Sequence, residues 1–321
     1  MSANLIIKMY PKSLFFLLFI AATSFAQRGA EVGVVSDNDL YFSSVNDKYY
    51  TNGFEFYYRY TNKKKKESTH KKMTEFKIGQ YIFVPYTRFA IESGRNDRPF
   101  AGYLFAEAGR NLFYQDESVL KMNLQLGFVG PNAFGEETQH FFHKNFGYKR
   151  IYGWQNQIRN AFAVQGNVFY SKKIFPHFND KIDFHVLADV NFGTVLNGMT
   201  AGILSRFSLK PLLPVYNSNL YGASANADSK VYKEEREFYF YINPGVNYQL
   251  YDTTVQGSLF SDNSPITRGI IPFRFTGEAG FKYRKNNWNL SYVFVYKGKE
   301  TRMPRNTGYF YGSIIIAHML N

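Results

Sequence analysis

The chain has 321 residues, a formal net charge of +13, no cysteine, and a large aromatic content of 33 Phe and 26 Tyr. The lack of cysteine excludes a disulfide framework and a thiolate metal site. The positive charge indicates an anionic partner, such as nucleic acid, a phosphorylated lipid or lipopolysaccharide. A basic nucleic-acid groove does not need so many aromatic side chains, whereas aromatic girdles at a membrane interface do. We therefore expect a membrane partner and no nucleic acid.

The N-terminal segment 1–26 is typical of a secretory signal peptide. A short apolar run, 13–22, follows two lysines and ends before the tripeptide Ser-Phe-Ala at 24–26, which resembles a cleavage site. The run is too short for a stable membrane span, although an uncleaved anchor helix is the alternative interpretation. We predict a mature single domain, 27–321, with a charge of about +11 once the two signal lysines are removed and with no transmembrane helix.

The rest of the chain alternates apolar and polar residues with a period of two, as β-strands with two different faces do. Within 182–192 the polar positions include Asp183, His185 and Asp189, which suit a wet lumen better than a dry core. This polarity, the aromatic content and the signal peptide together favour an all-β, antiparallel transmembrane β-barrel over a soluble sandwich. An even number of strands closes such a barrel, and we predict twelve. They fall near 30–37, 49–61, 74–84, 100–114, 118–129, 158–173, 180–193, 198–209, 236–251, 269–284, 287–299 and 307–320.

The parity of the strands predicts which connections share an end of the barrel. If the first strand starts in the periplasm, the first, third and fifth connections, near 38–48, 85–99 and 130–157, face outward. The unusual motifs of the chain lie on or beside these three. The lysine run 63–66 falls on the second connection. There it is better explained as a solvated turn than as an anion-binding patch.

The fifth connection carries more than a turn requires, with the sequence GPNAFGEETQHFFHKNFG at 130–147. Its Gly-Pro start breaks the strand, and the residues that follow predict a short helix in an outer-rim loop. Gln139 and His143 are four residues apart, so they would project from one face of that helix. His140 and His143 could be a metal-binding pair, but no third ligand follows at a known spacing. Loops at strand ends are common positions for functional residues.

Two other motifs lie on the first and third connections. The first is DND at 37–39 followed by DKYYTNG at 47–53, and its Asp, Asn and Thr oxygens are ligands of the kind that calcium prefers. Its alternative interpretation is an ordinary turn, because Asp and Asn cap and turn well. The second motif is DRPFAG at 97–102, which opens the fourth strand.

Together with GWQNQ at 153–157, these motifs resemble the outer-membrane lipid A 3′-O-deacylases, and they occur in the family's order over about 37–157. The resemblance implies a twelve-stranded barrel of the bacterial outer membrane with an active site near the outer rim. It implies calcium-dependent hydrolysis of the ester that holds the 3′-linked acyloxyacyl group of lipid A. The partner would be lipid A or lipopolysaccharide in the outer leaflet. A closed barrel needs no partner subunit, so we expect a monomer.

Residue by residue, the resemblance assigns His143 as the catalytic histidine and Gln139 as a site residue one helical turn earlier. Asn38, Asp39 and Thr51 match polar residues of the active site and its calcium region. Histidine, with an unperturbed pKa of about 6.5, suits the activation of water at neutral pH. A calcium ion can supply positive charge where the ester oxygen becomes an anion. Asp39 would bind calcium or orient the imidazole, and the sequence leaves both roles open.

The chain departs from the family pattern at two places that concern substrate binding. A family lysine in the third connection corresponds to Arg88 only if a gap is allowed, and arginine can bind a phosphate bidentately. The segment 146–152 has basic residues where a relative has an acid and a tyrosine. Tyr148 or Tyr152 could take the place of that tyrosine.

Two other functions stay open from the sequence. An outer-membrane phospholipase also uses a barrel rim, calcium and histidine, but it needs a serine nucleophile. Ser36, Ser43 and Ser44 lie near the first motif, and none has a recognisable nucleophile context. A non-enzymatic channel or adhesin is the other alternative, and it would not require the clustered polar residues at one rim.

Overall fold

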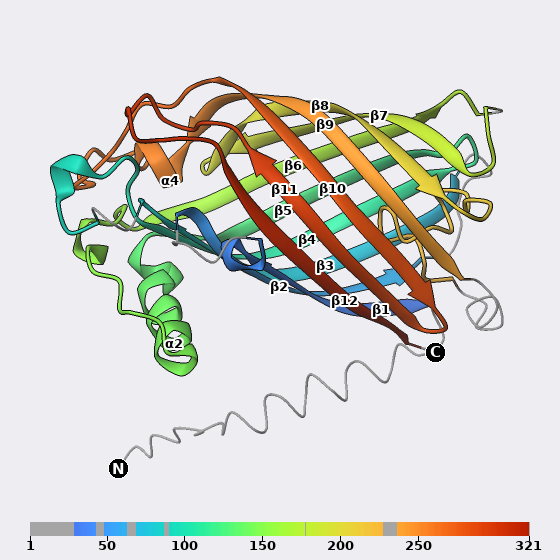
Figure 1. The fold of residues 1–321 in the computed structure, drawn as a ribbon, viewed down its shortest axis with the longest axis horizontal. Helices are drawn as coiled ribbons and strands as arrows, with labels where there is room; N and C mark the ends of the chain where they lie inside the picture. Colours follow the sequence, from blue (N-terminus) through green and yellow to red (C-terminus); the bar gives the residue numbers. More distant parts are fainter. Residues whose placement is uncertain are drawn as a thin grey trace, which may run out of the picture.

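The computed structural model describes residues 29–42, 48–62, 69–86, 90–176, 178–226 and 236–320. These residues form a closed antiparallel barrel, in which each strand pairs with its neighbours in sequence and the last strand pairs with the first (Figure 1). The predicted fold and the number of strands are confirmed. The strands are β1 (Ala30–Asn38), β2 (Tyr49–Thr61), β3 (Thr69–Val84), β4 (Ala101–Tyr114), β5 (Ser118–Val129), β6 (Ala161–Ile174), β7 (Ile182–Gly193), β8 (Leu196–Ser208), β9 (Glu237–Asp252), β10 (Phe273–Lys285), β11 (Trp288–Lys297) and β12 (Tyr309–Leu320).

The period-two pattern decides which side chains face the lumen. In β7, Asp183 and His185 are 2% and 0% exposed, whereas Val186 and Phe192 on the opposite face are 39% and 53% exposed. The prediction that His185 points into the lumen is therefore confirmed. Apolar side chains cover the outer wall, which is the arrangement that lets a barrel wall contact hydrocarbon.

The two ends of the barrel differ in their connections. Ala30 at the start of β1 pairs with Leu320 at the end of β12, which places both chain ends of the barrel at one rim. The helices α2 (Gly135–Phe146) and α4 (Thr253–Gln256) lie at the opposite rim, with the first, third and fifth connections (Figure 1). Outer-membrane barrels carry their longer loops outside the cell, so we call this end the outer rim and the other end the periplasmic rim.

Hydrogen bonds and ion pairs join the outer-rim connections to one another. The Tyr49 hydroxyl donates to the Asp97 carboxylate at 2.7 Å. Arg98 forms an ion pair with Glu300 at 2.8 Å, and both side chains are buried. The DRPFAG motif therefore holds the third connection to those before β2 and β12.

A few predicted features differ from the structure or lie outside it. β3 begins at Thr69 rather than at 74, because its first residues pair with β4 although they do not alternate. The predicted signal peptide, the lysine run 63–66 and Arg88 lie outside the described residues. None of the helices in the described part of the chain is both long and apolar enough to cross a membrane.

Candidate active site

Helix α2 is delimited by backbone conformations that its sequence favours. Gly130, with φ of 101°, precedes a 3₁₀ turn, η4 (Pro131–Ala133), and Phe134 adopts a left-handed conformation just before the helix. Two glutamates in the first turn and a lysine in the last complement the helix dipole. Gly147, with φ of 75°, ends the helix in the left-handed conformation that glycine adopts without strain. The short outer-rim helix predicted from the sequence is thus confirmed.

Helix α2 lies outside the barrel and packs on the wall formed by β3 and β4 (Figure 1). Gly102 of β4 allows the close approach, because a Cβ at this position would lie 3.1 Å from the Gly135 nitrogen. Gln80, on the outward face of β3, donates from Nε2 to the Ala133 carbonyl at 2.6 Å. The helix is therefore fixed against the outer surface of the wall rather than inserted in the lumen.

A cleft of about 400 Å³ separates α2 from the outer ends of β1, β2 and β3. It brings together four of the predicted site residues, namely Asn38, Thr51, His143 and Tyr148. The remaining lining mixes polar and apolar side chains, and the phenylalanines in it come from α2 and β2. It consists of Ser36, Asp37, Leu40, Tyr41, Asn52, Gly53, Phe54, Gln80, Ile82, Thr138, Phe142 and Phe146.

The hydrogen bonding of His143 fixes its tautomer. Its Nδ1 lies 2.5 Å from the Lys149 carbonyl oxygen, and the residue is only 8% exposed. A carbonyl oxygen can only accept, so Nδ1 carries the proton and Nε2 of the neutral ring carries the lone pair. The Tyr148 ring meets the imidazole edge to face, with centroids 5.6 Å apart. Nε2 is therefore the ring nitrogen that can take up a proton whenever the imidazole is neutral.

The DND motif forms the wall of the cleft opposite α2. Asn38 caps the 3₁₀ turn η1 (Asp39–Tyr41), and its Oδ1 accepts from the Leu40 nitrogen at 2.7 Å. The Asn38 Nδ2 group therefore remains for donation. Asp39 is 4% exposed and accepts from the Lys48 nitrogen at 3.0 Å and from the Thr51 hydroxyl at 3.3 Å. It orients Thr51 from behind rather than lining the cleft itself.

Gln139 also lies behind the cleft and not in its lining. It is fully buried, and its Oε1 accepts from the Trp154 indole nitrogen at 2.8 Å. This bond ties α2 to the 3₁₀ turn η5 (Trp154–Asn156), which contains the GWQNQ motif. The sequence predicted that Gln139 shares a helix face with His143, but it did not reveal that Trp154 is its partner. The rarity of tryptophan, which occurs only twice in the chain, was the one feature of the sequence that could have pointed to this partner.

His140 and Tyr152, which the sequence also singled out, lie outside the cleft. His140 is bonded through Nε2 to the Ile151 carbonyl at 3.1 Å, so it anchors the chain after α2. Tyr152 is exposed and has the Arg150 guanidinium over its ring. Among the described residues, no group of three or more His, Asp or Glu side chains is arranged to hold a metal.

The family model for the outer membrane protein LpxR matches residues 13–320. The chain belongs to the LpxR family. The resemblance inferred from the motifs is thereby confirmed at the level of the family, and the LpxR-family barrel is located in the outer membrane.

One solved structure agrees with the fold of this LpxR-family chain. LpxR from Salmonella typhimurium is 17% identical, with a TM-score of 0.70 over 90% of this chain and 99% of that chain. The beta domain of the Bordetella autotransporter BrkA is 9% identical, with a TM-score of 0.48 over 92% and 99% of the two chains. A search of the curated proteins found no match.

Proposed function

We propose that the protein is a lipid A deacylase that hydrolyses the ester of the 3′-linked acyloxyacyl group. The observation that carries this proposal is the cleft where His143, Asn38 and Thr51 meet on the outside of the wall. A lipid in the outer leaflet can reach such a cleft sideways, without entering the barrel. Phe54 and Phe146, half or more exposed at its edge, offer apolar contacts to an acyl chain.

The residues of the cleft support a general-base mechanism. His143 Nε2 takes a proton from a water molecule, whose oxygen attacks the ester carbonyl carbon. The carbonyl oxygen becomes an anion, and the Asn38 amide is placed to donate to it. The bond to the sugar oxygen then breaks, and this oxygen takes the proton back from His143. The products are the free acyloxyacyl acid and the sugar hydroxyl.

Calcium dependence forms part of the proposal. Asp39, with Thr51 beside it, provides carboxylate and hydroxyl oxygens of the kind that calcium prefers. The neighbouring Asp37 lines the cleft, and its buried Oδ1 has no hydrogen-bond partner among the described residues. These donors fit a hard cation, and we assign Asp39, which lies directly behind Thr51, as a ligand for a cation bound beside that hydroxyl. A bound calcium ion would supply positive charge that polarises the ester carbonyl.

Substrate binding is the part of the proposal that rests most on family resemblance. Tyr148 lines the cleft and is 52% exposed, so its hydroxyl can meet a polar group of the lipid. Tyr152 would contact the lipid beyond the cleft, and the family resemblance assigns Arg88 to phosphate binding. The partner is lipopolysaccharide of the outer leaflet, and the barrel acts as a monomer.

The test is mass spectrometry of lipid A from cells that express the wild type or His143→Ala. The wild type should release the 3′ acyl chains and His143→Ala should not, because the base is lost. His140→Ala is the matched control, since His140 lies on the same helix but outside the cleft. An unchanged lipid A profile with a folded wild-type barrel would refute the deacylase.

One observation bears on the phospholipase alternative. Ser36 lines the same cleft as His143, although its hydroxyl is bonded to the Tyr41 hydroxyl at 2.8 Å. A serine nucleophile would need the imidazole as its base. Ser36→Ala should leave lipid A deacylation unchanged. Loss of activity in this variant would favour a serine mechanism instead.

A further inference from the structure

The connection between β8 and β9 spans 209–236 and lies at the periplasmic rim, where barrels usually have short turns. It is described over 209–226. Leu209 at its start is 88% exposed, but Val215, Ser218 and Ser224 are fully buried. The segment therefore leaves the rim and folds back into the barrel.

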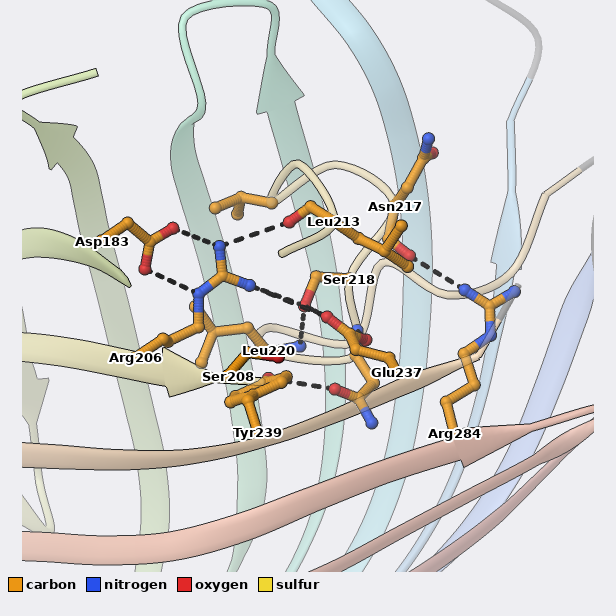
Figure 2. Close-up of polar contacts among 12 residues, drawn as sticks. Asp183, Arg206, Ser208, Leu213, Asn217, Ser218, Leu220, Glu237, Tyr239 and Arg284 are labelled. Atoms are coloured by element: carbon orange, nitrogen blue, oxygen red, sulfur yellow. Dashed lines mark hydrogen bonds and ion pairs between the residues drawn. The ribbon is translucent and has the colours of Figure 1, made fainter. Parts of the chain in front are cut away.

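A buried polar network fastens the segment to the strands that flank it, as Figure 2 shows. Arg206 of β8 forms an ion pair with Asp183 of β7. The same guanidinium donates to the Ser218 hydroxyl at 3.1 Å and to the Leu213 carbonyl at 3.3 Å. Ser218 in turn donates to Glu237 of β9 at 2.5 Å. The buried Arg206 guanidinium is thus surrounded by the carboxylates of Asp183 and Glu237 and by two groups of the segment, the Ser218 hydroxyl and the Leu213 carbonyl.

The segment also reaches two strands on nearly opposite sides of the ring. Lys71 of β3 donates to the Ala223 carbonyl at 2.6 Å. Arg284 of β10, nearly opposite β3 in the strand order, donates to the Asn217 carbonyl at 3.0 Å. One short stretch of chain can bind both only if it spans the lumen.

A second pair of contacts gives the same result. The Tyr221 hydroxyl lies 2.8 Å from the Ser171 hydroxyl of β6. The Ser224 hydroxyl donates to the Asn289 side chain of β11 at 3.3 Å, and β11 lies nearly opposite β6. The segment therefore crosses the lumen in two directions.

Gly222 shows how closely the segment fits the wall. Its φ is +78°, and a Cβ at this position would lie 1.4 Å from the Arg59 Nη1 atom. Arg59 cannot easily move, because ion pairs of 3.3 Å to Glu31 and Glu75 hold its guanidinium. Only glycine allows the chain to pass here.

The lumen above the segment contains two polar cavities, of about 530 Å³ and 200 Å³. Leu220 and Tyr221 border both of them. At the outer rim, the Arg98–Glu300 pair joins the connection before β4 to the connection before β12, and the Tyr49–Asp97 bond joins the former to the start of β2. We propose that 209–226 is a plug that closes the periplasmic mouth and makes the barrel non-conducting. This barrier function does not depend on the deacylase activity.

The test uses cysteine reporters, which the cysteine-free chain makes unambiguous. Ser224→Cys places a near-isosteric thiol within the plug, Thr200→Cys places one in the larger cavity, and Leu209→Cys is the exposed control. A charged thiol reagent added from the periplasmic side should label Ser224→Cys and Thr200→Cys at least about 100-fold more slowly than Leu209→Cys. Labelling of all three at similar rates would overturn the proposal.

Two further measurements complete the test. Replacement of 209–236 by a short hairpin turn should raise labelling of Thr200→Cys at least about tenfold, because Ser208 and Tyr239 are already paired. Equal labelling with and without the plug in a folded barrel would contradict the proposal.

The intact protein should give no conductance steps in a planar lipid bilayer. Steps typical of an open pore would also overturn it. Deacylation should survive the replacement, because the cleft lies outside the wall.

Discussion

The lumen and the outer cleft are both polar, but they are built differently. The lumen holds buried ions that are matched with one another, such as Arg206 with Asp183 and Arg59 with Glu31. Such networks are costly to bury and persist only when the charges are paired. The cleft combines a few polar groups with exposed apolar side chains and opens toward the lipid. In this barrel, a high density of buried charge marks structural support, and the catalytic candidate lies at the boundary between polar and apolar surface.

Two histidines make the contrast specific. His143 lines the open cleft, with its Nδ1 bonded to a carbonyl oxygen. His185 is fully buried in the lumen, with Nε2 3.2 Å from Asp183. His143 lies where a lipid ester can reach the cleft, whereas His185 is enclosed by the barrel wall.

Removal of calcium should abolish deacylation, because the site then lacks the positive charge that stabilises the oxyanion. Purified protein is assayed on lipid A with excess chelator and after calcium is restored. Magnesium should restore activity poorly, since it demands a tighter octahedral ligand set. Full activity in the chelator would remove calcium from the mechanism.

Asn38→Asp should lower kcat by about 10²–10³ with little change in stability. Aspartate keeps the cap on η1, because its carboxylate can accept from the Leu40 nitrogen, but it loses the amide donor. The measurement is kcat together with thermal unfolding. Asn52→Asp, in the same cleft without a capping role, is the control and should have a much smaller effect. Equal losses in both variants would indicate a general charge effect.

Trp154→Phe should reduce activity about tenfold or less and lower the free energy of unfolding by about 1–3 kcal/mol. The change leaves the buried Gln139 Oε1 without its indole donor, so α2 is held less firmly against the wall. The double variant with Gln139→Leu should recover part of the stability, since both polar partners are then gone. Additive losses would show that the two side chains are not coupled.

Arg206→Ala should destabilise the barrel by about 3–5 kcal/mol and leave the activity of the folded fraction within about twofold. It removes the cation that Asp183 and Glu237 share, and leaves Asp183 with the more distant Lys173 ammonium at 4.0 Å. Thermal unfolding and kcat are measured on the same preparation. A large fall in kcat at full folding would show that the lumen takes part in catalysis and would contradict its purely structural role.

The strands could be predicted from the sequence because one face contacts lipid and the other a polar interior. β2 and β5 occur at the predicted bounds for this reason. The pattern fails where pairing continues without alternation, as at Thr69 at the start of β3. The plug was not predicted, because its apolar residues, such as Val215 and Leu220, follow neither a helix nor a strand period.

The site was predicted in part. The motifs identified Asn38, Thr51 and His143, which the fold brings into one cleft. Spacing placed Gln139 on the helix face of His143, but its burial against Trp154 depends on how the chain after α2 returns to the barrel. The sequence also could not predict on which side of the wall α2 lies, because this depends on the close approach of Gly102 and Gly135.

The most direct test of the account is the deacylation rate of purified His143→Gln beside that of purified His185→Gln. Both changes replace a buried imidazole by an amide in a folded barrel, one in the cleft and one in the lumen. We predict that His143→Gln loses at least about 10² in kcat, as expected for removal of a general base, and that His185→Gln retains wild-type kcat. Retained activity in His143→Gln, or equal loss in the two variants, would contradict the assignment of catalysis to the outer cleft.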